Sequence, residues 1–237
     1  DPLPLLFPEG SLAETEQLYQ NSPPARTYNG LIAAAIDAML AAWPADRRLR
    51  VLEIGAGTGS TTAYLLPRLR QLPAGNVDYC FTDVSPLFLN RARDKFPDIG
   101  FLRTQLLDIG ADPAEQGFEA GSFDIVLGAN VLHATPDLGV TLSHVRDLLA
   151  PGGRLVLLEG ATPQRFGDLT VGLLEGWWCY RDTQRRDYAL MPRDAWLGLF
   201  RQLGFADARA LPAGNAGPVL RQQAVYLADA PQVVVPR

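Results

Sequence analysis

The sequence predicts an α/β fold built on a mostly parallel sheet of seven strands. From Arg50 onward, short apolar runs alternate with stretches of helical periodicity, and this alternation is typical of a doubly wound sheet. Residues 51–59 read VLEIGAGTG, an apolar run followed by three glycines. Such a run predicts a buried strand that ends in a tight turn, where the main chain can approach a ligand closely.

The remaining elements follow from the same periodicities. A Gly/Pro-rich stretch at 213–218 separates the last two apolar runs, which predicts that they pair as a C-terminal hairpin. Helices are expected at 60–72, 86–96, 137–149 and 193–203. Strands are expected at 50–54, 78–83, 99–103, 123–128, 153–159, 205–211 and 219–228.

Two segments fall outside the alternating core. Residues 12–43 have helical spacing that Pro23 and Pro24 divide into two helices. Residues 160–192, after the fifth strand, have no clear strand pattern and are expected to be an insertion that covers the cofactor cleft. The expected organisation is a helical N-terminal lid or substrate segment (1–49), a core (50–230) and a linker (231–237). The ends, Asp1-Pro2 and PQVVVPR, suggest a piece of a longer polypeptide.

Composition argues against several classes of protein. The formal net charge is −5 and no run of Lys or Arg occurs, which disfavours binding to nucleic acid or to an anionic membrane. No segment has the roughly 18 apolar residues of a membrane span, and no signal segment is present. Cys80 and Cys179 lie in apolar surroundings typical of a reducing compartment, so a cytoplasmic protein is expected. No metal-ligand cluster is visible.

The glycine-rich turn indicates which ligand the sheet binds. Its pattern is Gly-x-Gly-x-Gly, and Glu53 stands two residues before Gly55. An acid at this place would repel a pyrophosphate and attract an ammonium, which disfavours a dinucleotide. The stretch resembles the first motif of S-adenosylmethionine (SAM)-dependent methyltransferases, and SAM carries both an ammonium and a sulfonium. Glu53, Gly55 and Gly57 are therefore expected to bind the cofactor.

Polar residues at three further strand ends extend this prediction. Asp83 ends the second strand, where an acid commonly binds ribose hydroxyls, although it could instead cap the next helix. Asp108 follows the third strand and is expected to accept the adenine amino group while Ile109 packs on the ring; a solvated loop is the alternative. Asn130 follows the fourth strand, and its main chain is expected to face the methionine end of SAM.

Five longer stretches resemble the carbon-methyltransferase domains of modular polyketide synthases. The most specific are ANVLHAT and GLLEGWW, and the likeness also includes LFPEGS, LYQNSPPAR and Tyr28-Asn29 near the amino terminus. The five stretches are 52–66, 79–89, 116–149, 150–159 and 168–178. The resemblance implies a class I SAM-dependent methyltransferase fold and an enzyme that methylates the α-carbon of a β-ketoacyl chain. It also implies an acyl carrier protein, whose phosphopantetheine bears that chain, and neighbouring megasynthase domains as partners. S-adenosylhomocysteine (SAH) would be the product.

By the same resemblance, the catalytic His-Glu dyad of the family falls on His133 and Glu175. A histidine suits abstraction of an acidified α-proton, and a glutamate can orient its imidazole. Glu175 lies in an apolar run, where burial without a partner would be costly. The alternative for His133 is a capping or core imidazole. The other histidine, His144, lies within a predicted helix and is expected on its surface or in packing.

Aromatic and amide side chains complete the expected site. Trp177, Trp178 and Tyr180 would line an acyl tunnel or fill a small core, and Tyr19 and Asn29 would donate to the substrate carbonyl or lie on a helix surface. An O- or N-methyltransferase of an assembly line is the first alternative function. A catalytically silent SAM-fold domain is the second, and it is disfavoured because the motif residues are all in place.

Overall fold

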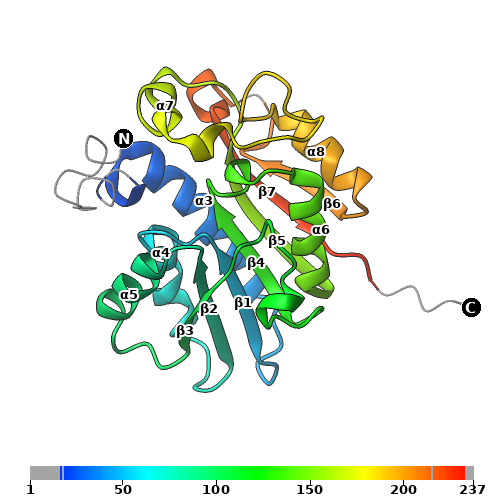
Figure 1. Cartoon of the computed structure of the whole chain (residues 1–237). Helices are drawn as coiled ribbons and strands as arrows, with labels where there is room; N and C mark the ends of the chain where they lie inside the picture. The colour runs from blue at the N-terminus through cyan, green and yellow to red at the C-terminus, as the bar shows by residue number, and fades with distance from the viewer. Residues whose placement is uncertain (1–16, 18, 215, 233–237) are drawn as a thin grey trace, which may run out of the picture.

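A computed structural model, which describes residue 17 and residues 19–214 and 216–232, contains one seven-stranded sheet between two layers of helices (Figure 1). The strands are β1 (Leu49–Ile54), β2 (Val77–Asp83), β3 (Leu102–Leu106), β4 (Phe123–Ala129), β5 (Leu149–Gly160), β6 (Ala206–Leu211) and β7 (Gln223–Asp229). The helices are α3 (Pro23–Leu40), α4 (Ser60–Leu69), α5 (Pro86–Lys95), α6 (Leu138–Leu148), α7 (Arg165–Leu169) and α8 (Arg193–Gln202). Short 3₁₀ turns are η2 (Ala114–Gln116), η3 (Leu132–Ala134), η4 (Val171–Leu173), η5 (Glu175–Trp178) and η6 (Pro218–Arg221).

The strand order is β3-β2-β1-β4-β5-β7-β6. Strands β1 to β5 pair in parallel, whereas β7 is antiparallel to both β5 and β6. The predicted fold class, including the C-terminal hairpin, is therefore confirmed. The chain turns toward opposite edges of the sheet after β1 and after β4, and open α/β sheets bind ligands in the crevice beyond the carboxyl ends of such strands.

Alternate residues of each strand enter two hydrophobic cores, one on each face of the sheet. On one face, α3, α4 and α5 pack on side chains such as Val51 and Tyr79. On the other face, α6 and α8 pack on Leu52 and Cys80, the residues next in sequence. The period of two between these faces explains why the strands read as continuous apolar runs, since neither side meets water.

Three strands begin at least three residues from the predicted position, and one of them, β5, begins at Leu149 rather than at residue 153. The third strand was expected at 99–103 but lies at Leu102–Leu106, because Ile99 is buried in the turn that precedes it. β3 is an edge strand, so its own residues are more polar than the apolar residues that precede it. The last strand begins at Gln223 rather than at residue 219, since η6 occupies the intervening residues.

Helix α3 is an integral layer of the domain. Its apolar residues, including Ile32 and Ile36, are buried against the sheet, and its buried Asn29 accepts a hydrogen bond from Thr61 of α4 at 3.0 Å. The expected lid segment 1–49 therefore contributes a core helix at residues 23–40, while residues 1–16 and 18 lie outside the described part of the chain.

After Gly160, the last residue of β5, the insertion at 160–192 contains α7, η4 and η5 and no further strand. It leaves the carboxyl end of β5, and η5 packs against η3, the turn that follows β4. In Figure 1, α7 lies above the sheet, apart from the helices that cover its two faces. None of the helices in the described residues is long and apolar enough to cross a membrane.

We expect Ile32→Ala to lower the free energy of unfolding by about 2–5 kcal/mol, the usual cost of truncating a buried isoleucine. Ile32 is 1% exposed in the core beneath α3. Denaturant unfolding would measure the change, and Val140→Ala on α6, where Val140 is 45% exposed, is the control. A loss no larger than that of the control would show that α3 is not part of the core.

Candidate active site

The glycine turn after β1 is shaped by packing on one side and is open on the other. Gly55 has a φ of +56° and a side chain there would overlap Cγ2 of Val131, so only glycine fits. Gly57 has a φ of +53°, and the nearest atom to a Cβ at this position would be 3.9 Å away. The space beside Gly57 is therefore a cradle in which a ligand can contact the main chain.

Glu53 does not face that cradle. Its side chain is 1% exposed, and one carboxylate oxygen accepts hydrogen bonds from the hydroxyls of Thr62 and Tyr79. Burial raises the pKa of Glu53 from 4.5 to about 7, and these two hydrogen bonds lower it only in part. The predicted contact with the ammonium of SAM is corrected: Glu53 ties β1 to β2 and α4, and thereby anchors the ends of the glycine turn.

Asp83 stands at the carboxyl end of β2, beside the glycine turn. One of its carboxylate oxygens accepts from the N–H of Gly57 at 3.0 Å and the other from the N–H of Ser85 at 2.9 Å. Burial raises the pKa of Asp83, and both main-chain hydrogen bonds oppose that change. The side chain thus fixes the turn and lies next to the cradle, and its role in ribose binding stays a prediction.

The residues predicted to surround adenine lie in different environments. Asp108 is exposed and accepts from the N–H of Gly110 at 2.9 Å, while Ile109 is 3% exposed in the core. Ile109 packs with the core beside the third strand, and its contact with the adenine ring stays a prediction. Val84, which follows Asp83, is 67% exposed. An exposed valine beside that carboxylate is an apolar surface that the sequence analysis did not name.

Asn130 directly follows β4, next to the point where the strand order changes. Its φ is +53°, a left-handed conformation that asparagine tolerates better than most residues. Its N–H donates to the carbonyl of Leu158 at 2.7 Å, which continues the pairing of β4 with β5 by one residue. The predicted contact of the Asn130 main chain with the cofactor stays a prediction.

His133 lies on η3 and is held by a carboxylate from the neighbouring strand. Its Nδ1 is 2.7 Å from Oε2 of Glu159, near the end of β5. His133 is 8% exposed and Glu159 is fully buried. The other carboxylate oxygen of Glu159 accepts main-chain N–H groups of Val131, Leu132 and His133 at 3.1, 2.7 and 3.4 Å. One buried carboxylate thus organises both the turn and the imidazole.

The predicted pairing of His133 with Glu175 is therefore wrong. Glu175 is exposed at the start of η5, so the cost of burial that suggested a partner for it does not arise. The fifth predicted strand, 153–159, ends in LVLLE, and Glu159 is the acid at that end. Glu159 is not named in the sequence analysis as the partner of His133. The signal available was its position, because β5 neighbours β4 and both carboxyl ends meet at one edge.

The aromatic residues of the insertion separate into two groups. The indole of Trp177 is 8% exposed and meets the His133 ring edge-on, with centroids 5.0 Å apart. Trp178 is 49% exposed, and its indole N–H donates to the carbonyl of Gly172 at 2.8 Å. Tyr180 stacks under Arg185, whose guanidinium carbon is 5.4 Å from its ring centre. Trp177 is thus the indole that meets the ring of the predicted base.

The two N-terminal candidates lie elsewhere. The side-chain amide of Asn29 donates to the carbonyl of Tyr19 at 3.2 Å, and its oxygen accepts from Thr61. Asn29 is 3% exposed, so its amide joins helices. Tyr19 is 40% exposed. The expected contact of either with substrate stays a prediction.

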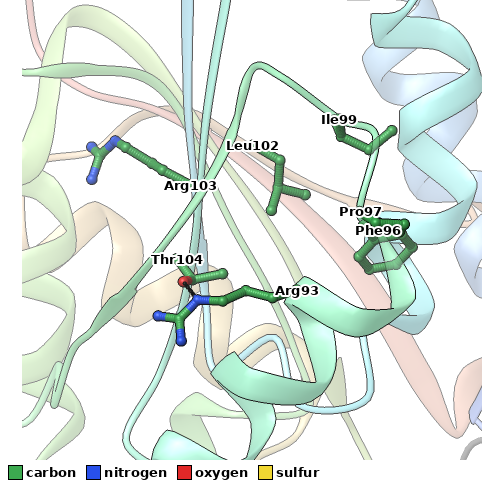
Figure 2. A pocket seen from close by; sticks show the side chains of 7 residues that line it. All are labelled: Arg93, Phe96, Pro97, Ile99, Leu102, Arg103 and Thr104. Atoms are coloured by element: carbon green, nitrogen blue, oxygen red, sulfur yellow. Dashed lines mark hydrogen bonds between the residues drawn. The ribbon is translucent and has the colours of Figure 1, made fainter.

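A surface cavity of about 250 Å³ lies between α5 and β3 (Figure 2). Within it, Nε of Arg93 donates to the hydroxyl of Thr104 at 2.9 Å. Nε of Arg103 donates a hydrogen bond to Oδ1 of Asp78 at 3.3 Å. The cavity borders the amino-terminal half of an edge strand, away from the carboxyl edge where Asp83 and His133 lie. We do not assign it to the active site.

Comparisons with known proteins agree with this fold. A family model described as a methyltransferase domain matches residues 52–155. Polyketide synthase ThaG of Burkholderia thailandensis is 42% identical over 233 residues, which are 97% of this chain and 4% of that protein. The solved CurJ carbon methyltransferase is 45% identical with a TM-score of 0.93, over 98% of this chain and 61% of that one. The solved complex of trans-methyltransferase CalH with SAH is 35% identical with a TM-score of 0.78, over 97% and 62%.

The chain spans a small fraction of the polyketide synthase and about three fifths of each of these two solved methyltransferases. The similarity extends over nearly all of this chain. It therefore covers both the glycine turn and the turn that carries His133.

The raised pKa of Glu53 predicts a pH-dependent stability. Its pKa is 4.5 in the unfolded chain and about 7 in the folded protein. The contribution of this group to stability is therefore fully present below pH 4.5 and is lost as the pH rises to 7. We expect this group to lower the free energy of unfolding by roughly 3 kcal/mol across that interval. Urea unfolding of the native protein and of Glu53→Gln, compared from pH 4.5 to 7.5, would measure it. A difference between them that does not vary with pH would contradict the assignment.

Proposed function

We propose that this chain, which belongs to the SAM-dependent class I methyltransferases and is homologous to polyketide synthase carbon-methyltransferase domains, methylates a β-ketoacyl chain. The methyl acceptor is the α-carbon of the acyl group. The acyl group is carried on the phosphopantetheine of an acyl carrier protein within a megasynthase. The observation that carries the proposal is the buried His133–Glu159 pair at the cofactor edge of the sheet. An α-proton flanked by a ketone and a thioester is acidic enough for a histidine base.

The residues at the carboxyl edge fit SAM. The open space beside Gly57 admits a ligand to the main chain, Asp83 can accept two ribose hydroxyls in addition to its main-chain bonds, and Val84 offers an apolar surface to adenine. Asn130 would meet the methionine end. When bound, SAM supplies an electrophilic methyl group on a sulfonium.

His133 would act as the base through Nε2. Because Nδ1 donates to Glu159 in the neutral tautomer, Nε2 keeps the lone pair that accepts the α-proton. Removal of that proton leaves an enolate and an imidazolium, whose positive charge Glu159 stabilises at 2.7 Å. The edge-on indole of Trp177 restricts the ring to this orientation.

Incubation of the chain with SAM and a β-ketoacyl carrier protein, followed by mass spectrometry of the acyl product, would test the function. We expect one added methyl group, located on the α-carbon by fragmentation. A methyl group on oxygen would instead support an O-methyltransferase, which a histidine base serves equally well. No transfer to this substrate would contradict the proposal.

We expect Asp83→Ala to weaken SAM binding by about 1–3 kcal/mol, because it leaves ribose hydroxyls and the Gly57 N–H without an acceptor. Isothermal titration calorimetry would measure the dissociation constant. Asp78→Ala is the matched control, since Asp78 lies near the other end of the same strand. Equal affinities in the two variants would remove Asp83 from the site.

We expect His133→Ala to lower the methylation rate by roughly 10²–10⁴, the usual contribution of a positioned base, with little change in SAM affinity. Glu159→Gln is expected to cause a loss of similar size, since an amide N–H facing Nδ1 favours the wrong imidazole tautomer. Rates at saturating substrate would be compared with those of Glu175→Gln, which is expected to retain most activity. A large loss in Glu175→Gln with a small one in Glu159→Gln would reverse our assignment of the pair.

Exchange of the substrate α-proton for deuterium gives an independent readout of the base. We expect the native protein to catalyse exchange without a methyl donor, and the His133 variant to lose this activity. If the His133 and Glu159 residues act as one unit, the double variant should lose little more than the more damaged single variant. Exchange at the native rate in the His133 variant would exclude it as the base.

A further inference from the structure

One short part of the insertion, residues 177–185, contacts the turn that carries His133 along most of its length. The main-chain N–H of Arg181 donates to the carbonyl of Pro136 at 2.8 Å. The thiol of Cys179 donates to the carbonyl of Ala134 at 3.2 Å. These bonds join segments more than 40 residues apart in sequence, so the insertion and the turn form one packed unit.

A buried ion pair lies at the centre of this contact. Arg185 donates from Nη1 to the carbonyl of His133 and from Nη2 to that of Thr135, both at 2.6 Å. Its Nε and Nη2 also donate to Oδ2 of Asp182, at 2.9 and 2.6 Å. The same carboxylate oxygen accepts the N–H of Leu138 at 3.0 Å. The pair therefore bridges the turn from His133 to the first residue of α6.

The chemistry of the pair suits this bridging. The side chains of Arg185 and Asp182 are 0% and 1% exposed. Burial raises the pKa of Asp182, but the hydrogen bonds from Arg185 and from the N–H of Leu138, together with the positive charge of Arg185, leave that pKa lowered, so the carboxylate stays charged. Apolar residues often stabilise a fold as well as a buried ion pair does. An apolar pair, however, could not donate hydrogen bonds to the carbonyl groups of His133 and Thr135.

The two buried charged groups act on opposite sides of His133. Glu159 binds Nδ1 and the main-chain N–H groups at the start of the turn, whereas Arg185 binds the carbonyl of His133 itself. Trp177, from the same insertion segment as Arg185, contacts the ring. Fixing both the main chain and the ring leaves the imidazole one position, and a shift of about 1 Å in a reacting group can cost roughly 10²-fold in rate.

We propose that Arg185, with its counter-ion Asp182, is a positioning residue that holds the main chain of His133 so that Nε2 faces the substrate α-carbon. This inference rests on the proposed function for the identity of the reaction. The insertion is then part of the catalytic geometry as well as a cover over the cleft, since its Arg185 determines where the base stands.

The test compares Arg185→Met with Arg154→Met in the full chain. Arg154 makes a bidentate ion pair with Asp229, and it lies five residues before Glu159 on β5, about 17 Å away along the strand. Nitrogen NMR of the imidazoles needs no substrate, and His144 is an internal reference because the chain has two histidines. We expect the His133 signals to change in Arg185→Met alone, with those of His144 unchanged.

Substrate exchange and cofactor binding complete the test. In Arg185→Met we expect α-proton exchange to fall about 10- to 100-fold, while the SAM dissociation constant stays within about threefold of the native value. Arg154→Met should retain the native exchange rate even where its melting temperature is lowered. Native His133 signals and native exchange in folded Arg185→Met would overturn the proposal.

A second variant guards against misfolding. Arg185→Met combined with Asp182→Asn leaves no buried charge without a partner, and the same changes in His133 signals and exchange are expected from it. If the native protein does not catalyse exchange, the proposed function fails, and the NMR comparison still tests whether Arg185 positions the imidazole. Unchanged His133 signals in the folded double variant would refute the positioning role.

Discussion

The candidate active site depends on one buried carboxylate. Glu159 is removed from water at the end of β5, and burying a charge is costly unless hydrogen bonds replace its hydration. Those bonds come from the imidazole of His133 and from three consecutive N–H groups of the turn after β4. The requirement to satisfy Glu159 therefore folds that turn, and the folded turn presents the histidine. Stability and catalytic geometry arise from the same contacts.

The glycine turn after β1 and the turn that carries His133 pack directly against each other. Val131, one of the residues bonded to Glu159, packs on Gly55 and Gly128 so closely that neither position accommodates a side chain without movement. Glu53 anchors the ends of the glycine turn from inside the protein through Thr62 and Tyr79. Because interiors are packed to the density of organic crystals, a displacement of either turn is transmitted to the other. The turn proposed to bind the methyl donor and the proposed base are thus held in a common frame.

The insertion after β5 completes this frame from the other side. It brings an aromatic ring to His133 and a buried cation to the carbonyl groups of the same turn. These contacts supply the carbonyl groups of the turn with donors that the core does not provide. Core, turn and insertion therefore meet at His133, each through a different kind of contact.

The sequence by itself determined the sheet, because buried parallel strands and amphipathic helices have periodicities that one chain displays locally. It also located the glycine turn, Asp83 and His133, since each lies at a strand end that the pattern reveals. The tertiary structure decided which side chains meet. Glu53 and Glu159 both stand at strand ends, yet one faces Tyr79 inside the protein and the other faces His133. The partner of His133 is 26 residues away, brought close only because β4 and β5 pair in parallel. Glu175, which the motif favoured, is instead exposed. A local pattern records where a strand ends, whereas the direction of a side chain at that end depends on neighbours that are distant in sequence.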